Sequence, residues 1–324
     1  MAEHGSPGRL SRLVDTAPLL IFALLLAYIA FEAHNFFSLL SFKLILNQSL
    51  PVVIICMGLA FVVMAGGDDV VSGGIDLSIP ATAVLCAGII AQWLATNGSL
   101  PVAVALAAGA ALLVGAINAL LVTRIGMTPL LTTLSMFVAV VGVNNVVTSS
   151  RRINVSDPVI LWLRDGQIAG VPVGIPIVAL IALSFYHLAH RTRIGLNMQA
   201  VGGSRDAAET SGLDVKKLQS ASFILAATTG FIASFFVLAR GSGSSPGVEN
   251  NLMLEMVLAT FLGAAFSGRR VVTLWGAVLG AVLVAAISIG FKSMGVNVFW
   301  TGLIKGSLIL AVVAFGALAQ RGRR

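Results

Sequence analysis

Charged side chains are scarce in this sequence of 324 residues. Asp, Glu, Lys and Arg together make up 10% of it, against about 25% in a soluble globular domain. Hydrophobic residues make up 57%, and the mean hydropathy is +0.98. These values exclude a soluble domain and indicate a chain that crosses a membrane several times. The net charge is +7, but no basic face is interleaved with aromatic residues, so a nucleic-acid partner is not expected.

Cysteine is nearly absent: Cys56 and Cys86 both lie in apolar runs, so a disulfide framework is not indicated. The sequence also lacks a phosphate-binding loop of the form G-x-x-x-x-G-K-[ST], so we expect any ATP hydrolysis on another polypeptide. No Ser/His/Asp or Cys/His arrangement indicates an enzyme. His187 and His190 share a helix face, but they have no carboxylate or thiol neighbours. We therefore expect them to interact with the dipole at the C-terminal end of their helix and not to bind a metal.

Apolar runs of about bilayer length fill most of the chain. They predict an all-α integral membrane protein with about ten transmembrane helices. We expect one membrane domain over residues 17–319, between tails at 1–16 and 320–324. The predicted spans are 17–31, 44–65, 78–95, 100–123, 127–148, 172–190, 217–239, 252–267, 271–290 and 299–319.

The distribution of basic residues predicts the orientation. If the N-terminus is cytoplasmic, 13 of the 20 basic residues fall on the inner side: Arg9, Arg12, Arg124, Arg191, Arg193, Arg205, Lys216, Lys217, Arg269, Arg270, Arg321, Arg323 and Arg324. Six fall on the outer side: Lys43, Arg151, Arg152, Arg164, Arg240 and Lys292. Because cytoplasmic loops carry an excess of Lys and Arg, both termini are expected inside.

The longest polar stretch, 191–217, contains five basic and three acidic residues. Within it Ser204 is suited to begin a short helix as its N-cap, Asp206 falls in the first turn, and Gly212 can end the helix. A helix of about two turns is marginal alone. The residues leave two interpretations open: the helix docks on a second protein, or it is a nascent helix in a loop at the membrane surface.

A second unusual stretch, GGDDVVSGGIDLSIP at 66–80, lies between two predicted spans. Gly73 and Gly74 permit a tight turn or a positive φ, and Asp76 or Ser78 is suited to cap the next helix. A role in capping and turning is favoured over direct contact with a substrate.

Two charges fall within predicted spans near the outer surface: Glu255 and Lys305. We expect them to form an ion pair, because an unpaired charge there is costly; the alternative is that Lys305 extends to the membrane surface. Neither interpretation gives a proton relay. Gly263, in the span of Glu255, is expected to allow close contact between helices.

Uncharged amide side chains also fall within the spans, and these are Asn47, Gln48, Asn118, Asn144 and Asn145. An amide offers both donors and acceptors to the hydroxyls of a sugar, so these residues are candidates for a substrate pathway. Hydrogen bonds between helices explain them equally well.

Four ordered motifs resemble the ribose-type sugar permeases of bacterial ABC transporters. The first is Ser72-Gly73-Gly74-Ile75-Asp76-Leu77-Ser78. The second is Arg193-Ile194-Gly195, followed by Ala200-Val201-Gly202-Gly203-Ser204, Ala207-Ala208 and Ser211-Gly212. The third is Glu255, eight residues before Gly263, and the fourth is Lys305 in Ile304-Lys305-Gly306. The matches cover the chain from about residue 47 to its end.

The resemblance implies a transport subunit that forms the translocation pathway for a monosaccharide in the bacterial inner membrane. It implies that 191–217 docks on a cytosolic ATPase, which holds the ATP and Mg²⁺. The docking residues would be Gly202, Gly203, Ser204, Arg205, Ala207, Ala208, Thr210 and Gly212, and the motif residues with a hinge role would be Gly73, Gly74, Asp76 and Ser78. Further implied partners are a periplasmic or lipid-anchored sugar-binding protein, which would meet the outer loops 149–171 and 241–251, a second permease copy, and membrane lipid.

The sequence departs from this family in three places. Residues 67–71 are an apparent insertion, Ile79-Pro80-Ala81 replaces a usual Val-Gly, and Ala264 to Arg270 replaces a run of glycines. These departures leave open which sugar is moved and whether the partner permease is identical. The alternatives are a permease for branched-chain amino acids or nucleosides, and an ion-coupled secondary transporter.

Overall fold

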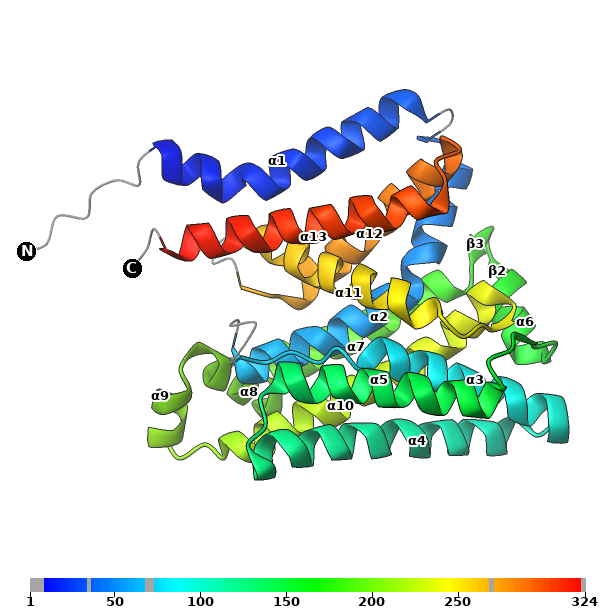
Figure 1. The fold of residues 1–324 in the computed structure, drawn as a ribbon, viewed down its shortest axis with the longest axis horizontal. Coiled ribbons are helices and arrows are strands. Elements are labelled where there is room, and N and C mark those ends of the chain that lie inside the picture. Colours follow the sequence, from blue (N-terminus) through cyan, green and yellow to red (C-terminus); the bar gives the residue numbers. More distant parts are fainter. Residues whose placement is uncertain (1–8, 34–35, 68–72, 268–270, 322–324) are drawn as a thin grey trace, which may run out of the picture.

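The computed structural model describes residues 9–33, 36–67, 73–267 and 271–321, which are almost entirely helical (Figure 1). Ten of the helices in these ranges have 18 or more residues: α1 (Arg9–Glu32), α2 (Leu39–Gly66), α3 (Ile79–Asn97), α4 (Leu100–Leu120), α5 (Pro129–Thr148), α7 (Gly174–Arg191), α10 (Val215–Gly241), α11 (Val248–Ala265), α12 (Leu274–Ser293) and α13 (Val298–Arg321). Shorter elements are the π-helix η1 (Leu121–Ile125), α6 (Pro158–Asp165), α8 (Arg193–Gly203), α9 (Arg205–Thr210), β1 (Ile153–Asn154), β2 (Gln167–Ile168), β3 (Val171–Pro172) and β4 (Gly243–Ser244).

Seven helical segments within the described ranges are long and apolar enough to cross a membrane. These segments are α2, α3, α4 with η1, α5, α7, α10 and α12. The described apolar parts of α1 and α13, Leu20–Glu32 and Trp300–Ala311, are shorter than a span. The chain is therefore an all-α membrane protein, and the predicted number of about ten spans is not established by length and composition.

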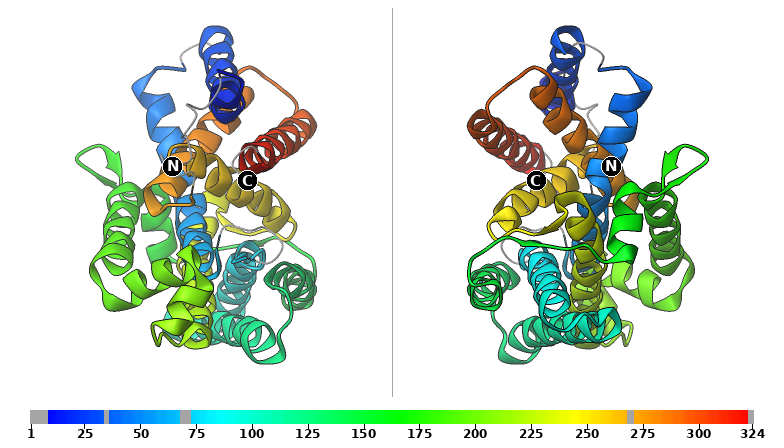
Figure 2. Two further views of the ribbon diagram at one scale, coloured as in Figure 1. Left: turned by 90° about the vertical axis from the view of Figure 1, so that its left-hand side faces the viewer. Right: turned by 90° about the vertical axis from the view of Figure 1, so that its right-hand side faces the viewer.

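The core of the bundle is built around α2 and α10, which pack against each other and against α3. In the most apolar 18-residue stretch of α2, 89% of the residues are buried, whereas the corresponding share is 28% in α4 and in α5. A helix that is apolar on all faces is expected to be buried, and α2 fits this expectation. Figure 2 shows α1, α4, α7 and α13 at the periphery of the bundle. Exposed apolar side chains such as Leu113 of α4 and Leu183 of α7 give this periphery the character of a lipid-facing surface.

The segment that joins α2 to α3 is not the simple turn predicted. Residues 73–78 have no regular secondary structure although they are buried. Figure 1 shows this stretch beside α5, with α3 starting partway along the bundle. Irregular backbone at this depth is stable in a membrane only where protein surrounds it. Here Gly74 N–H donates to the Gly67 carbonyl and Leu77 N–H donates to Thr133 Oγ1.

The two ends of the bundle differ in structure. At one end, called here the α9 end, lie α8, α9, the start of α1 and the end of α13 (Figure 1). At the opposite end, called here the α6 end, lie α6 and the hairpin of β2 and β3. There β1 pairs with β4 in antiparallel register, with Ile153 opposite Ser244. This pairing joins the two long loops, 149–171 and 241–251, that the sequence places on the outer side.

Candidate functional site

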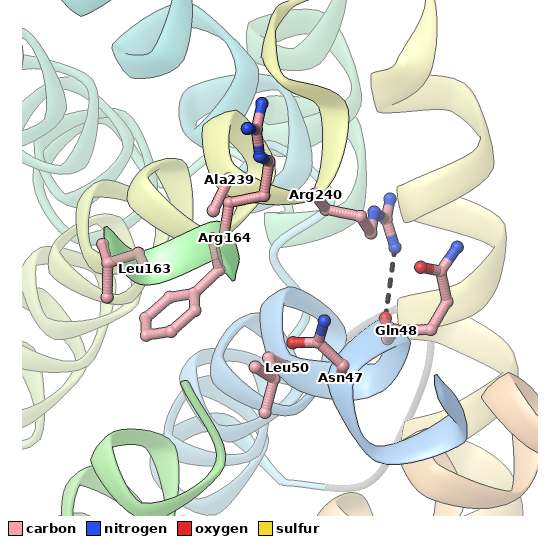
Figure 3. Close-up of a pocket in the computed structure, with 8 residues that line it drawn as sticks. Asn47, Gln48, Leu50, Leu163, Arg164, Ala239 and Arg240 are labelled. Carbon is pink, nitrogen blue, oxygen red and sulfur yellow. Dashed lines mark hydrogen bonds between the residues drawn. The ribbon is translucent and has the colours of Figure 1, made fainter. Parts of the chain in front are cut away.

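Two neighbouring pockets lie at the α6 end of the bundle. The smaller has a volume of about 120 Å³ (Figure 3) and is lined by Asn47, Gln48, Leu50, Leu163, Arg164, Phe236, Ala239 and Arg240. The larger has a volume of about 380 Å³ and is lined by Gln48, Val237, Arg240, Gly241, Gly243, Ser245, Val248, Asn251, Glu255, Thr301, Gly302 and Lys305. Gln48 and Arg240 line both pockets, so the two adjoin.

Arg240 lies between the two pockets, in the last turn of α10. A cation is favourable there because the helix dipole is negative at the C-terminus. Its Nη1 donates to the Gln48 carbonyl at 3.2 Å, so α10 is linked to α2 at this point (Figure 3). From the sequence, Arg240 is predicted only to be a positive charge on the outer side. Its part in a pocket depends on how α2 and α10 cross, which the sequence does not show.

The structure brings Glu255 and Lys305 together in the wall of the larger pocket. Glu255 on α11 accepts a hydrogen bond from Lys305 Nζ on α13, and the N–O distance is 2.6 Å. The side chains are 14% and 8% exposed. Pairing offsets much of the cost of removing each charge from water.

The remaining polar groups of the larger pocket are uncharged: Gln48, Ser245, Asn251 and Thr301. Amides and hydroxyls both donate and accept hydrogen bonds. A pocket with such a lining can bind a compact ligand rich in hydroxyl groups.

The amides predicted for a substrate pathway are not gathered in one place. Asn47 and Gln48 line the pockets, whereas Asn118, Asn144 and Asn145 line neither. Asn144 is buried against Gly88 of α3, and its side-chain nitrogen and oxygen have no hydrogen-bond partner among the described residues. Asn145 is half-buried elsewhere on α5.

Asn118 belongs to a buried hydrogen-bond network with Asp76 and Ser78. Asp76 Oδ1 accepts from the Ser78 N–H at 2.8 Å and from Ser78 Oγ at 2.6 Å. Asn118 Nδ2 donates to Ser78 Oγ at 2.8 Å. This network ties the irregular segment 73–78 to α4.

The predicted roles of 73–78 need two corrections. Ser78 occupies the N-cap position of α3, but its side chain makes no cap hydrogen bond. Its hydroxyl oxygen accepts from Asn118 instead, and its hydrogen is donated to Asp76. Gly74 does not have a positive φ. Gly74 is needed for a different reason: a Cβ there would collide with the Val62 carbonyl of α2.

At the opposite end of the bundle, α9 matches the short helix predicted from its capping residues. Ser204 Oγ accepts from the Ala207 N–H at 3.3 Å, and Gly212 has a φ of 82°. Of the side chains predicted to dock, Ser204, Arg205, Ala207 and Thr210 are exposed. Ala208 is buried in a small apolar cluster with Val201 and Val215, which holds α9 against α8 and α10.

The polar groups that follow α9 fix the start of α10. Asp214 accepts from the Lys217 N–H at 3.0 Å as the N-cap of α10. The Lys217 side chain, 2.9 Å from the same carboxylate, holds the pKa of Asp214 below its ordinary value. Residues 205–217 thus form an exposed, charged surface on a defined backbone.

Comparisons with known proteins identify the family. Residues 41–313 match the family described as branched-chain amino acid transport system / permease component. The ribose import permease protein RbsC of Escherichia coli is 27% identical over 93% of both chains. The probable ABC transporter permease protein y4mJ of Sinorhizobium fredii is 31% identical over 87% of this chain and 83% of its own.

A third relative, the galactose/methyl galactoside import permease protein MglC of Salmonella typhimurium, is 28% identical over 92% of both chains. No solved structure matches the chain significantly. The resemblance to sugar permeases inferred from the motifs is confirmed. The chain belongs to the permease-component family of ABC transport systems that its residues 41–313 match.

Proposed function

We propose that this chain is the permease subunit of an ABC importer that carries a monosaccharide across the bacterial inner membrane. The observation that carries the proposal is the similarity, over nearly the whole chain, to import permeases named for ribose and galactose. The polar pockets at the α6 end provide a place for such a ligand. The family description names branched-chain amino acids, but the relatives named for a substrate import ribose and galactose, so we propose a sugar.

The ten long helices are the proposed membrane spans, with the α9 end in the cytoplasm. The described basic residues at that end include Arg124, Arg191 and Arg193, and α9 and the start of α10 contribute Arg205, Lys216 and Lys217. This concentration agrees with the rule that cytoplasmic loops carry an excess of Lys and Arg. Both termini are then cytoplasmic, and the pockets face the periplasm.

The exposed surface of α9 is the proposed contact with a cytosolic ATPase. The sequence has no phosphate-binding loop, so the energy of ATP would reach this chain as a mechanical force. Two copies of the permease would form the pathway. A periplasmic binding protein would deliver the sugar to the joined loops of β1 and β4.

Cysteine crosslinking tests the docking surface, because Cys56 and Cys86, the two native cysteines, are buried. Thr210→Cys and Ala207→Cys in the assembled complex should crosslink to the ATPase subunit. Val159→Cys, which is exposed on α6 at the opposite end, is the control and should not. Failure of both α9 variants to crosslink in a complex that hydrolyses ATP would contradict the proposed docking.

A further inference from the structure

The larger pocket contains an excess of positive charge. Glu255 supplies one negative charge to the lining, and Lys305 and Arg240 supply one positive charge each. Glu255 is already engaged by Lys305 at 2.6 Å. Arg240 is therefore the charge in this pocket that has no carboxylate within ion-pair distance among the described residues.

Two other charged residues at this end of the bundle, Arg164 and Glu249, form no ion pair with Arg240. Arg164, which shares the smaller pocket, is paired with Asp165 at 2.6 Å. The buried carboxylate of Glu249 accepts from the Gly247 N–H with both oxygens, at 3.0 and 2.9 Å. Neither group forms an ion pair with Arg240, whose guanidinium is left to interact with the contents of the pockets.

The guanidinium of Arg240 also has unused hydrogen-bonding capacity. It carries five N–H donors in a fixed plane, and its one hydrogen bond to a described residue goes to the Gln48 carbonyl. A planar guanidinium with free donors matches the two oxygens of a carboxylate better than a single hydroxyl. A half-buried cation also gains more from a negative charge than from a neutral group.

We propose that the larger pocket takes a monosaccharide that carries a carboxylate, a sugar acid, whose carboxylate binds Arg240. Gln48, Asn251 and Thr301 line the same pocket and bind the hydroxyls of the sugar. The volume of about 380 Å³ lies at the small end of the range for ligand pockets, about 300–1,000 Å³, which suits one sugar ring. This inference rests on the proposed function and narrows its substrate class.

Thermal unfolding of the purified full-length chain in detergent tests the proposal directly. The probes are D-glucuronate, D-glucose and acetate, each titrated over the same range as its sodium salt or with matched sodium chloride. Glucuronate should raise the melting temperature at lower concentration than glucose, and acetate should have little effect. Arg240→Gln should weaken the response to glucuronate by about tenfold or more and leave the response to glucose nearly unchanged.

Two further variants control for misfolding and for the general loss of a positive charge. Arg240→Lys keeps the charge without the planar fork and should retain part of the preference for glucuronate, which a merely misfolded variant would not. Arg151→Gln removes an exposed charge beside β1 and should behave as the native chain does.

Three outcomes would overturn the proposal. The first is equal stabilisation by glucose and glucuronate that Arg240→Gln does not alter. The second is no stabilisation by either sugar. The third is loss of docking of an acidic binding protein in Arg240→Gln without any change toward glucuronate, which would assign the guanidinium to a protein carboxylate. ATP-driven uptake of a neutral sugar would leave the proposed function standing in each case.

Discussion

Gly202 of α8 lies directly against the carbonyl of Met64 in the last turns of α2, and a Cβ added at Gly202 would collide with that oxygen. The same end of α2 meets segment 73–78, because Gly74 lies against the Val62 carbonyl. The C-terminal end of α2 thus contacts both the proposed ATPase-docking region and the Asp76 segment. These are contacts between backbones, so we expect a displacement of α8 to reach α2 without a flexible side chain between them.

The close contact at Gly202 predicts a marked difference between two adjacent glycines. Gly202→Ala should lower the free energy of unfolding by roughly 1–3 kcal/mol, because the added methyl group forces backbone apart. Gly203→Ala is the control, because a Cβ at Gly203 would lie in open space. Alanine is also more favourable than glycine within a helix, so this variant should not be destabilised. Thermal unfolding of both purified variants decides the point. Equal stability of the two would show that α8 and α2 are not held together in this way.

The ion pair of Glu255 and Lys305 predicts that mutations of these two residues have non-additive effects on stability. Lys305→Met leaves the Glu255 carboxylate without its partner at a site that is 14% exposed, and the expected loss of stability is about 3–5 kcal/mol. The double variant Glu255→Leu with Lys305→Met removes both charges and should lose less than the sum of the single variants. Melting temperatures of the native chain and the three variants provide the cycle. Additive losses would contradict a direct interaction.

The hydrogen-bond network of Asp76 predicts that loss of this carboxylate lowers stability because the network is buried. Asp76→Ala removes the acceptor for the N–H and the hydroxyl of Ser78, and each buried donor left without a partner costs about 1–3 kcal/mol. Asp157→Ala is a matched control, because Asp157 accepts from the Val159 N–H two residues later in the same way but is only half-buried, at the start of α6. We expect Asp76→Ala to lower the melting temperature more than Asp157→Ala. The reverse order would show that the segment 73–78 does not depend on this carboxylate.

The close crossing of α11 and α12 predicts that substitution of Gly263 destabilises the protein. Gly263 and Gly276 approach so closely that a Cβ on either would collide with the carbonyl of the other, as the sequence predicts for Gly263. Gly263→Ala should therefore destabilise the protein, whereas Gly142→Ala, which adds a methyl group in open space on α5, should not. Size-exclusion profiles and melting temperatures of the two variants measure the difference. A stable Gly263→Ala protein would mean that the two helices can separate without cost.

Most of the helices could be predicted from the sequence because the bilayer fixes the length of an apolar run. The run 127–148 corresponds to α5 and the run 217–239 to α10, each within a few residues. Capping chemistry is local, so Ser204 and Gly212 also predicted α9 correctly. The pairing of Glu255 with Lys305 followed from the cost of an unpaired charge in the membrane.

What could not be predicted depends on contacts between distant segments. Segment 73–78 extends along the bundle because Gly74 fits against α2 and Thr133 of α5 accepts from the Leu77 N–H, and neither partner is visible from the local motif. Asn118 and Gln48 are both amide side chains in predicted spans, yet Asn118 donates to Ser78 and Gln48 lines the pockets. Helix α8 was missed because its sequence, rich in Gly and polar residues, is stabilised by packing on α2.

The central claim is that this chain works as one subunit of an ATP-driven sugar importer. The most direct measurement is purification of the chain from its native membrane in mild detergent, with mass spectrometry of the proteins that accompany it and a transport assay of the product in liposomes. We predict that an ABC ATPase and a secreted sugar-binding protein accompany it, and that sugar accumulates only when ATP is hydrolysed. A chain that purifies alone and moves sugar without ATP, driven by a proton or sodium gradient, would contradict the account.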